Sequence, residues 1–394
     1  MISVDEALDR LFGLSVPLGA EEVPLTEANR RVLARAVEAR RDQPPFAGSA
    51  MDGYALREAE LATGAVFEVI GESAAGARFA GPVGAGQAVR IFTGAPMPEG
   101  ADRVVIQEDV RREGDRITVT GDYGSGRNVR PAGGDFRTGD RVAAPRLLSP
   151  ADVALLAAMN IPRVPVTRRP RVALIATGNE LVQPGETPGP DQIVASNSYG
   201  LHALLTEAGA EVRLLPIARD RIDALETVFA LTREGHAPAD LIITIGGASV
   251  GDHDVVAQAA QGLGMEQSFY KVAMRPGKPL MAGRMGDAAM IGLPGNPVSA
   301  MVCGHVFVGP VIRHMLGLGA APAPRRRAPL AVDVPANGPR EHYLRARIGP
   351  DGIAPDDRQD SALLSVLSGA GALLVRAPHA PAARAGETVD YLPL

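Results

Sequence analysis

Three basic residues that could bind phosphate lie together in the segment "FYKVAMRPGKPL". Lys271 and Lys278 are the only two lysines among the 40 basic residues of the chain, and Arg275 lies between them. Lysine carries a compact point charge, whereas the arginine guanidinium is a flat fork, so the two are not interchangeable at an anion site. We therefore interpret this segment as a contact for phosphate or another oxyanion.

The segment "LPGNPVSA", residues 293–300, predicts the sharp start of a helix. Asn296 suits the N-cap position, where its side-chain oxygen accepts a backbone N–H, and Pro297 then falls at the first helical position. Unpaired N–H groups at a helix start favour anions. The sequence therefore predicts a second oxyanion contact at this point.

Carboxylates follow three predicted strands: Glu180 in "ATGNEL", Asp220 in "IARD" and Asp254 in "GGASVGDHD". Because carboxylates repel phosphate, they imply a cation between themselves and the ligand. Mg²⁺ is commonly held by one or two carboxylates together with substrate phosphates. The pattern indicates a phosphate-bearing or oxyanion substrate and a divalent cation.

The glycine-rich segment 246–251 permits two interpretations. Gly246 and Gly247 let a ligand approach the backbone closely, and Ser249 supplies a hydroxyl group, which suits an oxyanion site. The letters "GASVG" also match the nucleophile elbow of serine hydrolases. We favour the oxyanion site, because the acidic "DHD" that follows would place negative charge beside the alkoxide of a hydrolase.

The spacing of apolar residues predicts the elements that position these side chains. From about residue 170, continuous apolar strands alternate with helices, which is typical of a parallel, doubly wound sheet covered on both faces. Ligands bind such sheets at the carboxyl ends of the strands, where the candidate carboxylates and glycines lie. We expect this central α/β domain at 170–322.

Smaller units are expected around the central domain. Glycine-punctuated strand segments predict a mainly-β domain at 44–142, and strand-like segments predict a C-terminal β domain at 323–394. Residues 1–43 and 143–169 are expected to form one discontinuous helical and extended domain. Its two predicted helices, within "MISVDEALDRLFGL" and "SPADVALLAAMNI", are expected to pack on each other.

Composition excludes several classes of function. A net charge of −5 provides no basic field for nucleic acid, and no apolar run reaches the roughly 18 residues of a membrane span. The single cysteine, Cys303, allows no internal disulfide and is expected to be buried. The chain has no P-loop and no complete GxGxxG motif. We expect a cytoplasmic protein that binds neither nucleic acid nor membranes.

Seven segments in order resemble the motif series of the molybdopterin molybdenumtransferases, the MoeA family, to which the E domain of gephyrin also belongs. They are "PPFAGSAMDGYA" (44–55), "RIFTGAPMPEGAD" (90–102), "ATGNEL" (176–181), "IVASNSYGL" (193–201), "GGASVGDHD" (246–254), "AMRPGKP" (273–279) and "LPGNPVSA". The resemblance implies an elongated four-domain homodimer whose central α/β domain binds molybdopterin. It also implies insertion of molybdate into adenylylated molybdopterin, with Mg²⁺-dependent phosphoanhydride cleavage and release of AMP.

The resemblance also implies a site at the dimer interface, where the α/β domain of one chain faces the second and fourth domains of the other. Carried over by motif, the catalytic residues are Asp52, Thr93, Asp135, Glu180, Asp220, Asp254, Lys271 and Lys278. The substrate-binding residues are Ser249, Gly246, Gly247, Arg275, Pro294, Asn296, Pro297, Arg340 and Ser361. The metal ligands are Glu180, Asp220 and Asp254. The implied partners are the molybdopterin adenylyltransferase and maturation factors of molybdoenzymes, in transient contact.

The chain departs from the family pattern at four positions. Asn179 stands where Asp is usual, Ile245 where Ser is usual, Arg275 where Lys is usual, and Asp360 where Gly is usual. These changes leave open a divergent paralogue that binds the pterin as a scaffold without turnover. Adenylylation of molybdopterin by a related α/β domain is a further alternative, although it gives the "SAMDGYA" segment no role.

Overall fold

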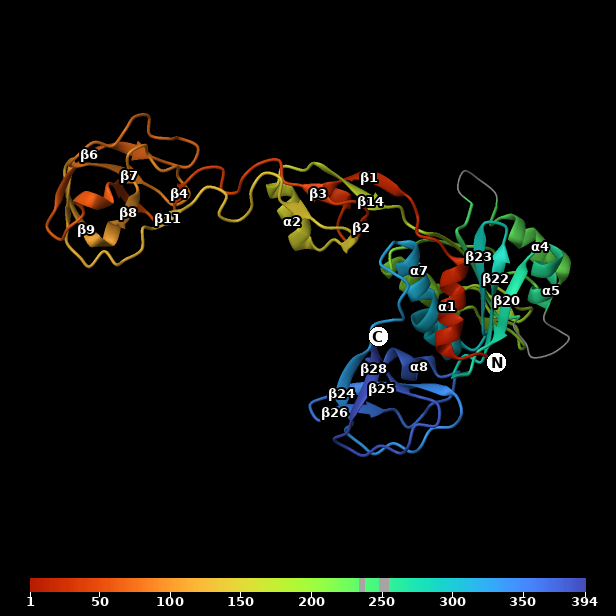
Figure 1. The fold of residues 1–394 in the computed structure, drawn as a ribbon. Coiled ribbons are helices and arrows are strands. Elements are labelled where there is room, and N and C mark those ends of the chain that lie inside the picture. The colour runs from red at the N-terminus through yellow and green to blue at the C-terminus, as the bar shows by residue number, and fades with distance from the viewer. Residues whose placement is uncertain (234–237, 248–254) are drawn as a thin grey trace.

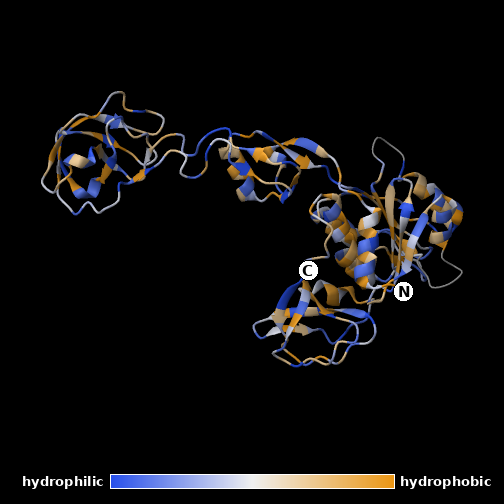
Figure 2. Ribbon diagram, in the orientation of Figure 1, coloured by the Kyte–Doolittle hydropathy of each residue, from blue (hydrophilic) through white to orange (hydrophobic). Residues whose placement is uncertain are grey.

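The structure, a computed structural model, describes residues 1–233, 238–247 and 255–394. The predicted site residues Ser249 and Asp254 therefore lie outside the described residues. The molecule is elongated: a distal β domain lies at one end, a small N-terminal sheet lies in the middle, and a central α/β domain with an attached C-terminal domain lies at the other end (Figure 1). Hydrophilic residues line much of the connection between the distal domain and the N-terminal sheet (Figure 2).

The central sheet is doubly wound, as the sequence predicts. Its order is β18 (Glu211–Leu214), β15 (Arg171–Ala176), β19 (Leu241–Ile245), β23 (Ala288–Leu293), β22 (Pro279–Met285) and β20 (Glu266–Lys271). The first four strands are parallel, and β22 and β20 are antiparallel additions. Alternate strand residues face opposite sides, so that Ile243 lies in one hydrophobic core and Ile242 in the other.

Helices cover both faces of this sheet. On one face pack α3 (Asn197–Glu207), α6 (Pro297–Cys303), the π-helical turn Gly304–Val308, and α7 (Gly309–Met315); on the other pack α4 (Ile222–Ala230) and α5 (Val255–Gly262). Among the described residues, only the continuous helix 297–315 is long and apolar enough to cross a membrane. Because 72% of its apolar window is buried inside the protein, it is a core helix. Cys303 is fully buried within it, as expected.

The N-terminal helix α1 (Val4–Leu14) forms as predicted, and the Ser3 side chain accepts the Glu6 N–H. The predicted packing of this helix on α2 (Pro150–Ala158) is wrong. The buried residues of α1 belong to the core of the central domain, and Arg284 of β22 donates to the Leu14 carbonyl at 2.9 Å. The amphipathic pattern predicts that a face is buried, but it does not specify which surface covers it.

Helix α2 instead packs on the small N-terminal sheet. That sheet has the order β1 (Ala20–Pro24), β14 (Arg163–Thr167), β2 (Val32–Leu33) and β13 (Arg146–Leu147), and a separate pair joins β3 (Val37–Glu38) to β12 (Arg141–Val142). As predicted, Ser149 caps α2, and Pro150 occupies its first turn. Two strands that precede the distal domain in the chain, β1 and β2, thus form one sheet with two strands that follow it, β13 and β14.

The distal domain is a six-stranded sheet with the order β8 (Arg103–Ile106), β5 (Gly53–Leu56), β7 (Gln87–Ile91), β6 (Val66–Ser73), β10 (Arg116–Val119) and β9 (Val110–Glu113). A further pair joins β4 (Gly48–Ser49) to β11 (Val129–Arg130). The strands enclose two small cores of their own. This domain therefore packs independently of the central sheet.

The C-terminal domain is tied to the central domain by a shared strand. Its sheet has the order β21 (Met274–Arg275), β25 (Glu341–Gly349), β27 (Ala372–Arg376), β28 (Thr388–Pro393) and β24 (Arg326–Pro329), with β26 (Gly352–Pro355) on β25 and the short helix α8 (Leu364–Ser368). Strand β21 lies in the "AMRPGKP" segment and runs parallel to β25. The C-terminal domain is thereby held beside the central sheet.

Candidate functional site

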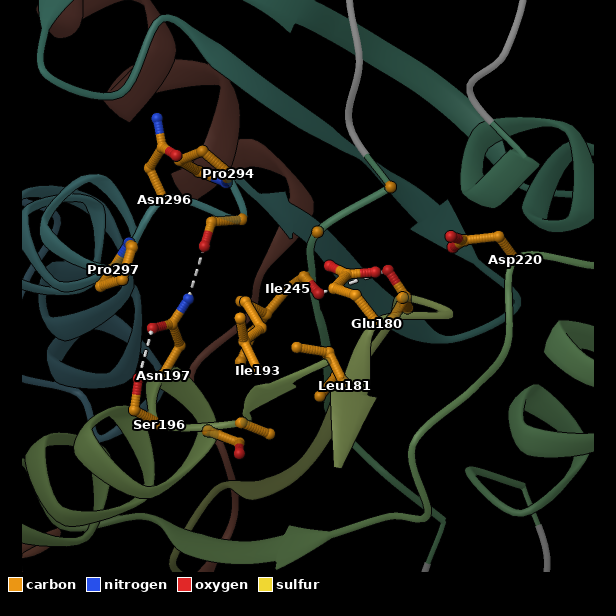
Figure 3. A pocket seen from close by; sticks show the side chains of 18 of the residues that line it. Glu180, Leu181, Ile193, Ser196, Asn197, Asp220, Ile245, Pro294, Asn296 and Pro297 are labelled. Atoms are coloured by element: carbon orange, nitrogen blue, oxygen red, sulfur yellow. Dashed lines mark hydrogen bonds between the residues drawn. The ribbon is translucent and has the colours of Figure 1, made fainter. Parts of the chain in front are cut away.

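A cavity of about 820 Å³ opens at the carboxyl ends of β15, β19 and β23. Seven of the predicted site residues line it: Glu180, Asp220, Gly246, Gly247, Pro294, Asn296 and Pro297. Figure 3 shows the Glu180 and Asp220 side chains on one side of this pocket and the Pro294–Pro297 turn on the other. The structure thus gathers the acidic and glycine-rich motifs around one space, as the topology of a parallel sheet requires.

Glycines at the base of the pocket are required by close backbone contacts. Gly246 and Gly247 have φ angles of +93° and +67°. A Cβ at Gly246 would lie 2.6 Å from the Thr177 carbonyl oxygen, and one at Gly247 would lie 2.2 Å from Cγ2 of Val256. These positions therefore admit only glycine without a shift of the backbone. The neighbouring departure Ile245 lines the pocket with an apolar side chain.

The start of α6 differs from the prediction in one respect. Pro297 occupies the first turn, and Asn296 the N-cap position, but the Asn296 side chain makes no capping hydrogen bond to the helix. Its Nδ2 donates to Ser361 Oγ at 3.1 Å, and the Val298 N–H donates to the Ser361 carbonyl at 3.0 Å. A residue of the C-terminal domain thus accepts one N–H of the helix start, so that group is not free for an anion.

The C-terminal domain of the same chain therefore forms part of the pocket wall through Ala362, and the neighbouring Ser361, which does not line the pocket, contacts Asn296 of the wall. This differs from the expectation that the fourth domain of the other chain faces the central domain. Arg345, only 1% exposed, donates from Nη2 to the Asp360 carbonyl at 3.0 Å. The departure Asp360 accepts the Ala362 N–H on its carboxylate at 2.8 Å, which closes the turn that carries Ser361.

The basic residues of the "FYKVAMRPGKPL" segment lie beside the pocket and are not among the residues that line it. Lys278 is exposed and directly precedes Pro279, which does line the pocket. Lys271 is half-buried, with Nζ 5.4 Å from the centre of the Tyr270 ring. The predicted oxyanion segment therefore adjoins the cavity at its β22 side.

Positive charge also gathers where this segment meets the C-terminal domain. Arg275 lies opposite His342 in the parallel pairing of β21 with β25. Nη1 of Arg340 lies 3.5 Å from the Met274 carbonyl. Burial, together with the charges of Arg275, Arg345 and Arg340, lowers the pKa of His342 to about 4. His342 is therefore neutral at pH 7, and the arginines supply the positive charge there.

The predicted residues of the distal domain are not brought to this pocket. The Thr93 N–H and hydroxyl both donate to one oxygen of Asp52 at 2.7 Å, and these bonds lower the pKa of that carboxyl. Asp135 is exposed, and its N–H donates to the Gln43 carbonyl at 2.9 Å. Figure 1 shows the distal domain at the end of the molecule opposite the central sheet.

Sequence reasoning missed two residues that organise the pocket. Asn197, at the start of α3, donates from Nδ2 to the Gly295 carbonyl at 2.7 Å and so joins α3 to the turn before α6 (Figure 3). Arg219 donates to carbonyls of the loop that carries Glu180. The sequence "ASNS" is typical of a helix start and could have indicated Asn197. For Arg219 the sequence gives no indication except that it precedes Asp220.

The donor set of the pocket suits Mg²⁺. Across residues 1–233, 238–247 and 255–394, no group of three or more His, Cys, Asp or Glu side chains could hold a metal by itself. Glu180 and Asp220 nevertheless face the same cavity. Mg²⁺ keeps several waters and is usually held by one or two carboxylates plus substrate oxygens. Two carboxylates that face one open pocket meet that requirement.

Comparisons with known proteins agree over the whole chain. Family models match residues 2–160 (MoeA N-terminal region, domain I and II), 173–314 (probable molybdopterin binding domain) and 327–394 (MoeA C-terminal region, domain IV). A molybdopterin molybdenumtransferase of Nostoc is 40% identical over 81% of this chain and 75% of its own length. One from Staphylococcus aureus is 30% identical over 99% and 95%. The crystal structure of a molybdopterin biosynthesis MoeA protein from Pyrococcus horikoshii superposes with a TM-score of 0.83 at 28% identity, covering 100% of both chains.

Proposed function

This chain belongs to the MoeA family of molybdopterin molybdenumtransferases and acts in molybdenum cofactor biosynthesis, and we propose that it inserts molybdate into adenylylated molybdopterin with release of AMP. The proposal includes Mg²⁺-dependent cleavage of the phosphoanhydride. The observation that carries it is that Glu180 and Asp220 face one pocket at the carboxyl ends of the parallel strands. A phosphoanhydride substrate with Mg²⁺ is the ligand that such a pair suits.

In this proposal the carboxylates and the basic segment have separate tasks. Glu180 and Asp220, together with Asp254, would hold Mg²⁺, which when bound would neutralise charge on the phosphate oxygens. Lys271, Lys278 and Arg275 bind the negative charge of phosphate and molybdate from the β22 side of the pocket. Holding both reactants in one cavity lowers the entropic cost of bringing molybdate to the dithiolene.

The rest of the pocket binds and orients the substrate. Gly246 and Gly247 allow close approach of the ligand to the backbone, and Ser249 adds a hydroxyl group. Pro294, Asn296 and Pro297 shape the opposite wall, and Arg340 and Ser361 act from the C-terminal domain. The contact between Asn296 and Ser361 supports this assignment, because it joins the two walls.

We also propose that the protein works as a homodimer of four-domain chains, with domains at 1–43 plus 143–169, 44–142, 170–322 and 323–394, except that helix α1 at the start of the first domain packs in the core of the central domain. Asp52, Thr93 and Asp135 would then reach the pocket from the partner chain. The ordered pair of Asp52 and Thr93 on an exposed surface supports this, because the hydrogen bonds hold a carboxylate ready at a place remote from the pocket of its own chain.

The cellular setting is part of the same proposal. We place the protein in the cytoplasm, in transient contact with the molybdopterin adenylyltransferase that supplies its substrate and with maturation factors that accept its product. A net charge of −5 supports a partner set without nucleic acid.

The test is AMP release from adenylylated molybdopterin, with molybdate and Mg²⁺ each added and omitted. We expect release only when both are present. If the substrate binds but no AMP appears under any combination, turnover is absent, and the chain is a pterin-binding scaffold. Release without molybdate would mean that hydrolysis is uncoupled from metal insertion and would contradict the proposed reaction.

A further inference from the structure

Two loops at neighbouring strand ends carry the pocket carboxylates. Residues 177–181 follow β15, and residues 218–220 follow β18. The Gly178 N–H donates to the Ala218 carbonyl at 3.1 Å, and Thr177 forms a parallel bridge with Ala218. The loops thus continue the pairing of their strands, and Glu180 and Asp220 project from the points where this pairing ends.

Arg219 binds the backbone on both sides of Glu180. Its Nη1 lies 2.8 Å from the Asn179 carbonyl oxygen, 3.2 Å from that of Leu181 and 3.4 Å from that of Gly178. Within residues 178–181 the remaining carbonyl, that of Glu180, accepts the Ile193 N–H at 2.8 Å. Four consecutive carbonyls are therefore bound, which fixes the loop backbone around the carboxylate.

Asn179 joins the same loop to Asp220 by a reciprocal pair of contacts. The Asn179 N–H donates to Asp220 Oδ2 at 3.3 Å, and the Asp220 N–H donates to Asn179 Oδ1 at 3.2 Å. The Asp that is usual at this position could accept the same N–H. It would, however, add a negative charge beside the Asp220 carboxylate. Asparagine therefore keeps the two hydrogen bonds and makes the site less negative.

The direction of the Glu180 side chain depends on this loop. A Cβ placed on Gly178 would lie 2.6 Å from Glu180 Oε2 and 2.7 Å from Oε1, so the carboxylate lies directly over the Gly178 backbone. Any rotation of the peptide at 178–179 would displace it. Since the Arg219 guanidinium holds these peptides, it controls a carboxylate without contacting it.

We propose that Arg219 and Asn179 are positioning residues that hold Glu180 and Asp220 at a fixed separation, and that Asn179 in place of Asp sets the cation affinity of the pair. The part that concerns cation binding rests on the proposed function. The part that concerns loop order rests on the hydrogen bonds alone. The two parts call for separate measurements.

The first measurement is binding of Mn²⁺ alone to the full chain, followed by electron paramagnetic resonance, with Mn²⁺ as a probe for Mg²⁺. We expect Arg219→Gln to weaken binding roughly 10-fold, as loss of residues that orient metal ligands commonly does. Arg219→Lys is expected to recover only part of the loss, because its ammonium group can replace Nη1 as a donor but ends a shorter side chain. Asn179→Asp is expected to tighten binding severalfold.

The matched control is Arg213→Ala. Arg213 is an exposed arginine of β18 that donates to one carbonyl, that of Leu231, at 3.1 Å. It should leave Mn²⁺ affinity unchanged. If Arg219→Gln lowers the thermal midpoint as Arg213→Ala does but leaves the Mn²⁺ affinity at the wild-type value, Arg219 is only structural and the proposal fails.

The second measurement is hydrogen exchange of the amides at 178–182, which requires no metal. We expect exchange there to be faster in Arg219→Gln and unchanged in Arg213→Ala. Unchanged exchange in Arg219→Gln would overturn the positioning role. If the wild-type chain binds no Mn²⁺ even with AMP present while exchange responds as expected, the cation part of the proposed function fails and the loop-positioning role stands.

Discussion

The pocket of the central domain and the Asp52–Thr93 pair of the distal domain use carboxylates in opposite ways. Glu180 and Asp220 face a cavity of about 820 Å³ whose walls come from two domains of one chain. Asp52 lies on an exposed surface, and one of its oxygens already accepts two hydrogen bonds from Thr93. The pocket is thus lined by residues of two domains of one chain, whereas the Asp52–Thr93 pair lies apart from it, so its proposed role requires a partner chain.

The largest expected effect is that of Asp220→Asn. We expect AMP release to fall roughly 100-fold or more, because the change removes one of the carboxylates proposed to hold Mg²⁺ against the reacting phosphates. The thermal midpoint should be unchanged, since Asp220 lies in a loop at the pocket. Asp223→Asn, an exposed acid that pairs with Arg221, is the matched control. Equal losses in the two variants would contradict a site built on Asp220.

Lys278→Ala is expected to lower turnover about 10-fold, less than the carboxylate change, because Lys271 and Arg275 remain nearby. Lys278 is exposed, so the free energy of unfolding should stay within about 0.5 kcal/mol of the wild type. Steady-state AMP release and urea unfolding check this. A loss of stability that matches the loss of turnover would mean that Lys278 has a structural role only.

Asp360→Gly tests the wall that the C-terminal domain provides. The change restores the residue that is usual in the family but removes the acceptor of the Ala362 N–H, so we expect the free energy of unfolding to fall by about 1 kcal/mol. AMP release should change less than it does in Lys278→Ala. A larger fall in turnover than in that variant would mean that the turn around Ser361 contributes directly to the reaction.

The smallest effect is expected for Thr93→Val in the distal domain, which keeps the Asp52 carboxylate. Thr93→Val removes the hydroxyl that donates to Asp52 and leaves the loop less firmly held. Because Thr93 lowers the pKa of Asp52, that pKa should rise toward its ordinary value in the variant. A lowered carboxyl pKa stabilises the fold above the unfolded pKa, and this contribution is lost as the pH falls through the folded value. The variant should therefore lose less stability between neutral and acid pH. A carboxyl titration by NMR that is identical in the two proteins would contradict this account.

Much of the central site could be predicted from the sequence, because its logic is local and topological. Apolar runs that alternate with helices predict parallel strands, and the carboxyl ends of such strands meet at one edge of the sheet. Glu180, Asp220, Gly246 and Pro294 could therefore be placed around one pocket without coordinates. The start of α6 at Pro297 followed from local capping rules in the same way.

The contacts that the sequence could not reveal are those whose partners lie far away in the chain. The Asn296 side chain binds Ser361, 65 residues away, instead of capping its own helix. Arg219 reaches Asn179 across 40 residues. Helix α1 packs on the central domain instead of α2. In each case a polar group or an apolar face has several acceptable partners, and only the tertiary structure selects one of them.

The most direct test of the proposed shared site is complementation between two variants that are expected to be inactive, Asp52→Asn and Asp220→Asn. The two proteins are mixed in equal amounts and allowed to exchange subunits. If the pocket of one chain takes Asp52 from its partner, mixed dimers contain one intact site and one doubly altered site. AMP release should then recover to about a quarter of the wild-type rate, because half of the dimers are mixed and each has one working site. No recovery, with mixed dimers demonstrated by differential tags, would contradict a site shared between chains.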